Sequence, residues 1–217
     1  MFHRLLALLF PPRCVLCRRF LPKDQTDFCH HCREHAPEFG KPKTQLSFLA
    51  VWTAVWYYKD TVRDSILRYK FSGRRSYALA YGRVLAMKLR KEGLDDFDLL
   101  TWVPIAPLRR LRRGYDQVEL LAGEVACNLG VQSTKTLRKI RNTPPQSGIA
   151  NVSHRRANVL GAYKPVQPDV IRGKRILLLD DVITTGATAS ECARTLLTAG
   201  AKEVVCAALA ASSYNSK

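Results

Sequence analysis

The stretch 175-RILLLDDVITTGATASE-191 decides the fold, because an apolar run leads into two adjacent carboxylates and then into a threonine-rich loop. Residues 176–179 have the composition of a buried strand. Two like charges at the end of such a strand are costly unless a ligand or a counter-charge stabilises them. Gly186 lets backbone N–H groups approach an anion, and a helix that begins at residue 188 favours a phosphate at its N-terminus. The stretch therefore predicts a site for a sugar phosphate.

The side chains of this stretch have the donors and acceptors that such a ligand needs. Open α/β sheets bind their ligands at the C-terminal ends of the strands. Asp180 and Asp181 would accept hydrogen bonds from the vicinal hydroxyls of a ribose, with Mg²⁺ able to bridge. The hydroxyls of Thr184, Thr185 and Thr188 would donate to phosphate oxygens. The alternative is an ordinary strand-to-helix turn in which the acid pair occurs by chance.

Residues 176–188 resemble, without a mismatch, the PRPP-binding signature of type I phosphoribosyltransferases, PRPP being 5-phosphoribosyl 1-pyrophosphate. The resemblance implies that the two acids hold the ribose hydroxyls and that the loop holds the 5-phosphate. It also implies displacement at ribose C1 with pyrophosphate leaving, helped by Mg²⁺ bound with the substrate. The binding residues that the signature implies are Asp180, Asp181, Val182, Thr184, Thr185, Gly186, Ala187 and Thr188.

A basic segment, 103-VPIAPLRRLRRGYDQ-117, is predicted to leave one strand as a loop and to precede a helix. Guanidinium groups suit the pyrophosphate of PRPP, because each can donate two parallel hydrogen bonds. Arg113 joins the two carboxylates as a catalytic candidate. The alternative is a solvated basic turn. The arginines that this segment offers to pyrophosphate are Arg109, Arg110, Arg112 and Arg113.

Four of the seven cysteines fall within nineteen residues, with the spacing C-x2-C-x11-C-x2-C. Each Cys-x-x-Cys pair places two thiolates on one side of a turn, and two pairs complete a tetrahedron around zinc. Four thiolates leave no open position, so the zinc is expected to be structural and to stabilise a segment with little core of its own. An iron–sulfur cluster, or ligation by His30, His31 or His35, is the alternative. The predicted ligands are Cys14, Cys17, Cys29 and Cys32.

The order of these features resembles the ComF family, in which a four-cysteine zinc module precedes a phosphoribosyltransferase domain. That family usually has Arg-Gly-Phe-Asn-Gln where this chain has 113-RGYDQ-117, so the part played by Asp116 stays open. In 66-ILRYKFSG-73, Lys70 falls in the family's Lys-Tyr/Phe-x-Gly region and is expected to reach the phosphates. The resemblance covers nearly the whole chain, from Pro11 onward.

The polar segment 143–163 also resembles ComF proteins, which have Thr-Pro-Pro-Gln and then an arginine and an asparagine before a strand. Related transferases close a mobile loop over the substrate at this point, and the composition of the segment fits such a lid. A surface loop without a role is the alternative. The matching residues are Thr143, Pro144, Pro145, Gln146, Arg156 and Asn158, and Gln146 is assigned to the PRPP site.

Strands that alternate with helices predict a parallel sheet covered on both faces. We expect an α/β fold of the type I phosphoribosyltransferase kind, with its hood and flexible loop, over residues 46–217. A zinc module with an apolar lead-in occupies residues 1–45. Strands are expected at 48–58 (or a hairpin there), 98–104, 175–179 and 203–210, and helices at 60–71, 76–93, 115–130 and 188–199. Cys127 and Cys192 fall in these helices and are expected in the core.

The apolar run at residues 5–10 is shorter than the core of a secretory signal, and no run approaches the roughly 20 residues of a membrane helix. We therefore expect a cytoplasmic protein with at most peripheral membrane contact. In a reducing compartment, cysteines serve as thiols or metal ligands before disulfides.

The net charge of +17, from 35 basic and 18 acidic residues, favours polyanionic partners. ComF proteins are associated with natural transformation, so the resemblance implies single-stranded DNA and DNA-uptake proteins as partners. Trp52, Trp56, Tyr57 and Tyr58 are candidate stacking faces for bases. A competence protein with a PRPP site is the leading hypothesis. The alternatives are an amidophosphoribosyltransferase-like metabolic enzyme with an unknown acceptor and a PRPP sensor without turnover.

Overall fold

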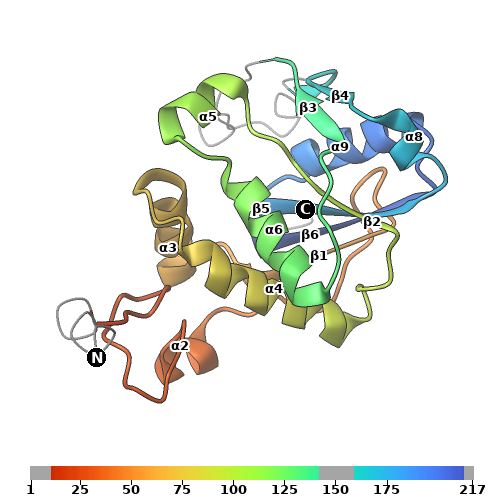
Figure 1. Ribbon diagram of the computed structural model, residues 1–217. Helices are drawn as coiled ribbons and strands as arrows, with labels where there is room; N and C mark the ends of the chain where they lie inside the picture. Colours follow the sequence, from red (N-terminus) through yellow and green to blue (C-terminus); the bar gives the residue numbers. More distant parts are fainter. Residues whose placement is uncertain (1–10, 142–158, 213–217) are drawn as a thin grey trace.

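The computed structural model describes residues 11–141 and 159–212. Among these residues, a parallel sheet in the order β1-β6-β5-β2 forms the centre of the protein (Figure 1). Its strands are β1 (Val51–Tyr57), β2 (Leu99–Trp102), β5 (Arg175–Ile183) and β6 (Glu203–Ala211). A separate antiparallel pair joins β3 (Leu137–Lys139) to β4 (Tyr163–Pro165). The predicted parallel α/β sheet is confirmed, and residues 51–57 form a single strand with no hairpin.

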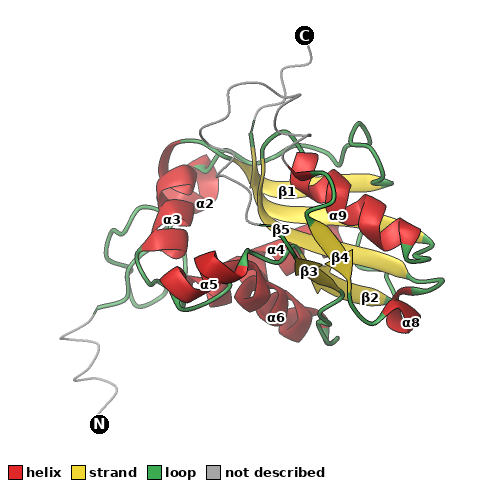
Figure 2. Cartoon of the chain, turned by 90° about the horizontal axis from the view of Figure 1, so that it is seen from above, coloured by secondary structure: helices red, strands yellow, loops and turns green. Residues whose placement is uncertain are grey.

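Helices cover both faces of the sheet, as Figure 2 shows. On one face α4 (Tyr77–Glu92) and α6 (Gln117–Leu129) pack against the strands and share a core with α3 (Asp60–Phe71). On the other face lies α9 (Ala187–Thr198), which also contacts β4. The shorter helices are α2 (His30–His35), α5 (Pro107–Arg113) and α8 (Pro168–Ile171). No helix within the described ranges is long and apolar enough to cross a membrane.

Strand β5 continues past the point where we expected it to end. It pairs with β6 as far as Ile183, whereas its pairing with β2 stops at Leu179. Asp180 and Asp181 therefore lie inside a strand but beyond the end of its neighbour, at the carboxyl edge of the sheet. The prediction that the strand stops at residue 179 was wrong, because pairing with β6 keeps the backbone extended for four more residues.

Alternation along β5 decides which face each carboxylate occupies. Leu177 and Leu179 belong to the core under α4 and α6, whereas Leu178 belongs to the core under α9. Successive side chains of a strand point to opposite faces. The side chain of Asp180 is therefore on the same face as that of Leu178, and the side chain of Asp181 is on the same face as that of Leu179. The two carboxylates are neighbours in sequence and lie on different faces of the sheet.

The basic segment that we expected as a loop is the helix α5, so that expectation was wrong. Pro107 stands at its first turn, where proline is favoured, and Gly114 ends it with a left-handed φ of 75°. Asp116 then caps α6, because its Oδ1 accepts hydrogen bonds from the N–H groups of Val118 and Glu119 at 2.9 and 3.2 Å. Its Oδ2 accepts from Ile105 N at 3.1 Å. Asp116 thus organises the backbone around the arginines; asparagine could cap α6 with its one oxygen, but its NH₂ group could not accept from Ile105 N.

The cysteine module is packed on the rest of the protein. Ser65 of α3 donates to the carbonyl of Val15 at 2.5 Å, and Arg68 donates to that of Leu16 at 2.5 Å. On α4, Arg83 forms two hydrogen bonds with Asp27, at 2.6 and 2.8 Å. Residues 38–43 run along the free edge of β1, to which they form isolated bridges. The division into domains at residue 45 stays a prediction, since both parts share one core.

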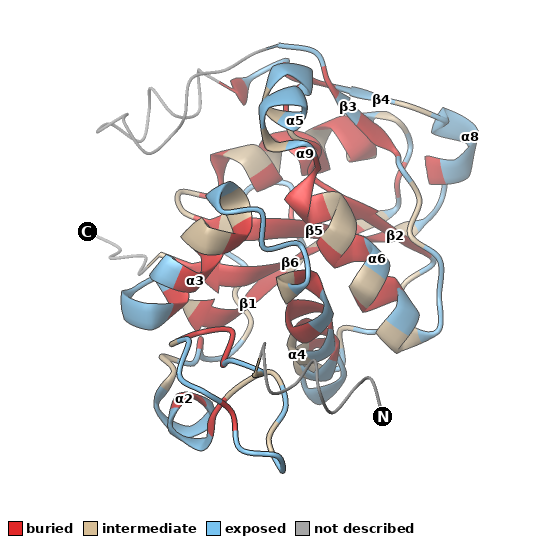
Figure 3. Cartoon of the chain, turned by 60° about the vertical axis from the view of Figure 1, so that its left-hand side comes forward, coloured by how far each residue is buried: buried red, intermediate tan, exposed pale blue. Residues whose placement is uncertain are grey.

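The buried residues lie in the sheet and on the helix faces that point toward it, as Figure 3 shows. Their positions correct two predictions, one about the aromatic residues of β1 and one about Cys127. Trp52 and Trp56 are buried, and Tyr57 and Tyr58 are half-buried. The tryptophans are therefore not available as stacking faces for bases, because β1 is covered on both sides. Cys192 is buried as expected, but Cys127 is exposed, since it lies on the outer face of α6.

Candidate functional site

The four cysteines of the module form a cluster. Their Sγ atoms all lie within 4.8 Å of one another, and Cys17 Sγ is 3.6 Å from Cys29 Sγ. Sulfurs about 3.8 Å apart are what a tetrahedral zinc with bonds of about 2.3 Å requires. Cys29 caps α2 and Cys32 lies within it, so the helix fixes the second Cys-x-x-Cys pair. The side chains of the three histidines at 30, 31 and 35 are exposed and stand outside the cluster.

The chemistry of this cluster fits zinc. Burial, and then the neighbouring cysteines, raise the pKa of the Cys32 thiol well above its ordinary value. Four sulfurs this close cannot all be thiolates without a cation, and a divalent ion that accepts four thiolates removes the conflict. All four protein ligands are supplied by the chain, which leaves no coordination position for a substrate. The site is therefore structural.

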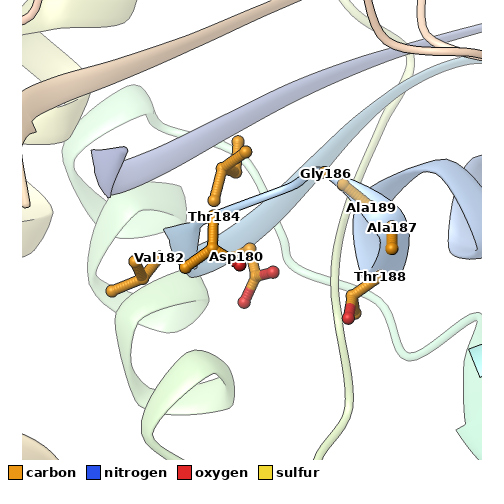
Figure 4. A pocket seen from close by; sticks show the side chains of 8 residues that line it. Asp180, Val182, Thr184, Gly186, Ala187, Thr188 and Ala189 are labelled. Carbon is orange, nitrogen blue, oxygen red and sulfur yellow. The ribbon is translucent and has the colours of Figure 1, made fainter. Parts of the chain in front are cut away.

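A second site lies where β5 turns into α9. The hollow there is lined by residues of the predicted signature, and Figure 4 shows the Asp180 carboxylate and the Thr188 hydroxyl on the same side of the loop that joins them. Gly186 has a φ of 74°, and a Cβ on it would lie 2.4 Å from a methyl carbon of Leu46. The N-cap residue Gly186 has no side chain, and Thr185 Oγ1 accepts from Ala187 N at the long distance of 3.5 Å, so the N-terminus of α9 is only weakly capped and favours an anion. The lining residues are Asp180, Val182, Ile183, Thr184, Gly186, Ala187, Thr188 and Ala189.

Asp180 is nearly enclosed, with 8% of its surface exposed. Burial, and then the charge of Asp181, raise the pKa of Asp180 to about 8. Lys139 of β3 is also buried, and its ammonium lies 5.1 Å from the ring centroid of Tyr163. Burial lowers the pKa of Lys139, while the charge of Asp180 raises it. Sequence reasoning missed Lys139, because nothing in residues 137–139 distinguishes an inward lysine from an exposed one.

Asp181 stands in a chain of short polar contacts. Its Oδ1 accepts from Lys70 Nζ at 2.6 Å, and its Oδ2 accepts from Gln117 Nε2 at 2.6 Å. Gln117 Oε1 in turn accepts from Arg113 Nη1 at 2.7 Å. The structure thus brings together Lys70, Arg113 and Asp181, which sequence reasoning had assigned to one site. Gln117 was missed, although it ends the motif 113-RGYDQ-117.

The other predicted residues are placed less tightly. Burial lowers the pKa of Arg113 and of Lys139, and the charge of the half-buried Arg109 lowers both further. Arg110 pairs with Glu119 at 3.0 Å, and Arg112 is exposed. Thr185 is half-buried in the turn before α9. The residues assigned to the lid, Thr143, Pro144, Pro145, Gln146, Arg156 and Asn158, lie outside the described residues, and their roles stay predictions.

A parallel sheet whose carboxyl edge presents paired acids, a threonine loop, a helix N-terminus and an arginine helix defines a phosphoribosyltransferase-like protein, here with a zinc module. Comparisons with known proteins agree: residues 119–215 match the phosphoribosyl transferase domain, and residues 5–43 match the double zinc ribbon domain. DNA utilization protein YhgH of Escherichia coli O157:H7 is 31% identical, over 91% of this chain and 96% of that protein.

Two competence proteins are also similar. Competence protein F of Haemophilus influenzae is 25% identical over 88% of this chain and 93% of its own length. Competence protein ComFC of Streptococcus pneumoniae is 33% identical over 70% of this chain and 64% of its own length. The chain belongs to the ComF family.

Proposed function

We propose that the protein binds PRPP with Mg²⁺ at the carboxyl edge of the sheet. The observation that carries the proposal is the hollow between Asp180 and the N-terminus of α9, which would place the sugar at the carboxylate and the phosphate at the helix. The 5-phosphate would lie on the loop from Thr184 to Thr188, where backbone N–H groups and hydroxyls donate to it. Lys70 and Arg113, brought close to Asp181, supply positive charge for the pyrophosphate.

The chemistry that this arrangement supports is transfer of phosphoribose to an acceptor. The bond between ribose C1 and pyrophosphate breaks, a bond from the acceptor to C1 forms, and the acceptor loses a proton. The chain would contribute by holding the sugar at Asp180 and by stabilising the departing charge with Arg109, Arg112, Arg113 and Gln146. Mg²⁺, bound with the substrate, would neutralise pyrophosphate charge, and Asp180 and Asp181 are the carboxylates that would hold it.

Titration calorimetry with PRPP and Mg²⁺ tests the site. The zinc-loaded wild type is expected to bind, and Asp180→Asn/Asp181→Asn is expected to lose at least roughly a hundredfold in affinity, because both acids are buried at the site. Arg172→Ala, a change at an exposed arginine away from the sheet edge, is the matched control and should bind like wild type. Failure of a folded, zinc-loaded wild type to bind PRPP would refute the proposal.

We further infer that the protein acts in the cytoplasm on single-stranded DNA taken up during natural transformation. Three observations support this role: the similarity to a DNA utilization protein and to a competence protein, the net charge of +17, and the exposure of Arg110 and Arg112 on α5. Phosphate contacts release counterions, so binding should weaken steeply with salt. The alternative function is that of a metabolic transferase, which would release pyrophosphate in the presence of a small acceptor and would not bind DNA.

Fluorescence anisotropy with a labelled single strand checks the DNA role. Arg110→Ala/Arg112→Ala is expected to weaken binding about tenfold and to flatten the dependence on salt, since each lost phosphate contact removes roughly one released counterion. Arg172→Ala again serves as the control for loss of one exposed charge. Equal affinities for the double variant, the control and the wild type would contradict a role for α5.

A further inference from the structure

We propose that Phe71 and the arginines around it form a platform for single-stranded DNA, in which the ring stacks on a base and the guanidinium groups bind the neighbouring phosphates. The inference deepens the proposed DNA role and rests on it. Phe71 is the last residue of α3 and is 66% exposed. It therefore offers the aromatic face that the buried tryptophans of β1 do not offer.

The place of Phe71 on α3 explains why its ring is exposed. The side of α3 that faces the core carries Val62, Ile66 and Tyr69. Phe71 follows Tyr69 by two residues, which is about 200° around the helix, so its side chain points away from that core. A base stacked on the ring would remove this apolar surface from water.

Arg113 covers one face of the Phe71 ring. Its guanidinium carbon lies 4.7 Å from the ring centroid, in a cation–π contact. Arg113 is itself held, because its Nη1 donates to Gln117 Oε1 at 2.7 Å. An exposure of 66% with one face under a guanidinium leaves the opposite face in solvent. The ring is therefore fixed on one side and accessible on the other, which is the arrangement that base stacking without sequence preference needs.

The turn after α3 and the helix α5 bring further arginines to this ring, and Figure 2 shows α3 and α5 on the same side of the molecule. Arg75 Nη2 donates to the Gly114 carbonyl at 3.0 Å, and its guanidinium carbon lies 4.8 Å from the centroid of the Tyr115 ring. These contacts hold the turn against the end of α5. Arg74 and Arg112 are exposed in the same two segments, and neither guanidinium has a hydrogen-bond or ion-pair partner among the described residues.

The charge of this surface suits a phosphate backbone. Residues 65–91 contain no aspartate or glutamate, and neither do residues 99–115. Arg110 is paired with Glu119 at 3.0 Å, so the unpaired charge comes from the other arginines of the two segments. Positive charge alone would bind single and double strands alike. The exposed ring favours the single strand, because the bases of a duplex are already stacked on one another.

Fluorescence anisotropy with a labelled oligothymidine, and with an abasic strand of the same length, tests the platform. Phe71→Leu keeps an apolar side chain and is expected to weaken oligothymidine binding about tenfold, because the stacked base is lost. Its affinity for the abasic strand should stay within about twofold of wild type, since that strand has phosphates but no bases. Phe71→Trp should bind oligothymidine at least as tightly as wild type does.

The arginines should give a different result in the same assay. Arg74→Ala/Arg112→Ala is expected to weaken binding of both strands and to reduce the salt slope by about 1.4, because two phosphate contacts are lost. Phe71→Leu should keep the wild-type slope. Its PRPP affinity should also stay within about threefold of wild type, since Lys70 still pairs with Asp181.

Phe20→Leu is the matched control, because Phe20 is 57% exposed and has the guanidinium carbon of Arg13 at 3.9 Å from its ring centroid, but it lies in the zinc module. It should bind both strands as wild type does. A Phe71→Leu protein that binds oligothymidine like wild type, or that loses affinity equally for both strands, would overturn the inference. A loss of PRPP affinity above about tenfold would also overturn it, by placing Phe71 in the PRPP site. A wild type that binds no single strand would instead refute the proposed DNA role itself.

Discussion

Asp180→Asn is expected to raise the free energy of unfolding at about pH 8 by roughly 2–5 kcal/mol, although it removes a carboxylate of the proposed site. Burial is the main cause: it raises the pKa of Asp180 from 3.8 to about 8, and the charge of Asp181 adds to it. Lys70 and Lys139 act in the opposite direction without offsetting the burial. The folded protein therefore holds a charge at Asp180 only at a cost, which is the kind of instability that binding sites retain.

The direction of the pH dependence follows from proton binding. In the window between about pH 4 and about pH 8, the folded state keeps a proton on Asp180 that the unfolded chain has released. Stability therefore falls as the pH rises through this window. Below it both states are protonated, and the charge of Asp180 has no effect. Asparagine resembles the neutral acid in shape, so the gain of the variant should be largest near pH 8 and should vanish near pH 4.

Urea unfolding of wild type and Asp180→Asn at pH values from about 4.5 to about 8.5 checks this expectation. Asp181→Asn is the matched control, since it removes one carboxylate from the same strand. It should lower stability near neutral pH, because the Asp181 carboxylate is paired with Lys70 and Gln117. Parallel pH profiles for wild type and Asp180→Asn would show that the charge of Asp180 is not a source of instability.

Loss of the zinc site is expected to destabilise the whole protein, and not the N-terminal module alone. Cys14, Cys29 and Cys32 lie in the same core as Trp56 and residues of α3 and α4. The free energy of zinc binding, on the order of 10 kcal/mol in small zinc modules, contributes to folding when the site exists only in the folded state. A zinc-free variant should therefore expose apolar surface of the transferase domain and unfold at least about 10 °C lower.

The ligand site should respond to the same change. Ser65 and Arg68 bind carbonyls of the module, and Lys70 of the same helix pairs with Asp181. Displacement of the module would release α3 at the end that carries Lys70. We therefore expect PRPP affinity to fall about tenfold or more in any zinc-free protein that remains folded.

Cys14→Ser, examined by calorimetric unfolding, zinc content and PRPP titration, tests both expectations. Cys127→Ser is the matched control, because that cysteine is exposed on α6 and lies outside the four-cysteine cluster. It should keep its zinc, its unfolding temperature and its PRPP affinity. A zinc-free Cys14→Ser protein that unfolds at the wild-type temperature would mean that the module contributes nothing to the stability of the domain.

Much of the site could be read from short stretches of sequence. One stretch contains a strand that leads into two acids, then a threonine loop, and then the beginning of a helix. Each Cys-x-x-Cys pair likewise lies within a single turn. Such features depend on backbone geometry over a few residues, which local patterns specify. Local patterns were less informative about where elements begin and end. Strand β5 runs four residues longer than predicted, because pairing with β6 extends it. Residues 107–113 form a helix where we predicted a loop, with Pro107 in its first turn and Gly114 at its end.

Contacts between distant residues were decided only by the tertiary structure. Lys70, Gln117 and Asp181 are far apart in sequence, and their hydrogen bonds exist because α3, α6 and β5 pack on one another. The same packing turned Cys127 outward, carried Lys139 inward and buried the tryptophans of β1. The sequence by itself determined that two carboxylates stand at the carboxyl edge of a parallel sheet. Alternation along β5 places the two carboxylates on different faces of the sheet. Only the packing of helices on these faces decided that Asp180 lines a hollow and that Asp181 accepts hydrogen bonds from Lys70 and Gln117.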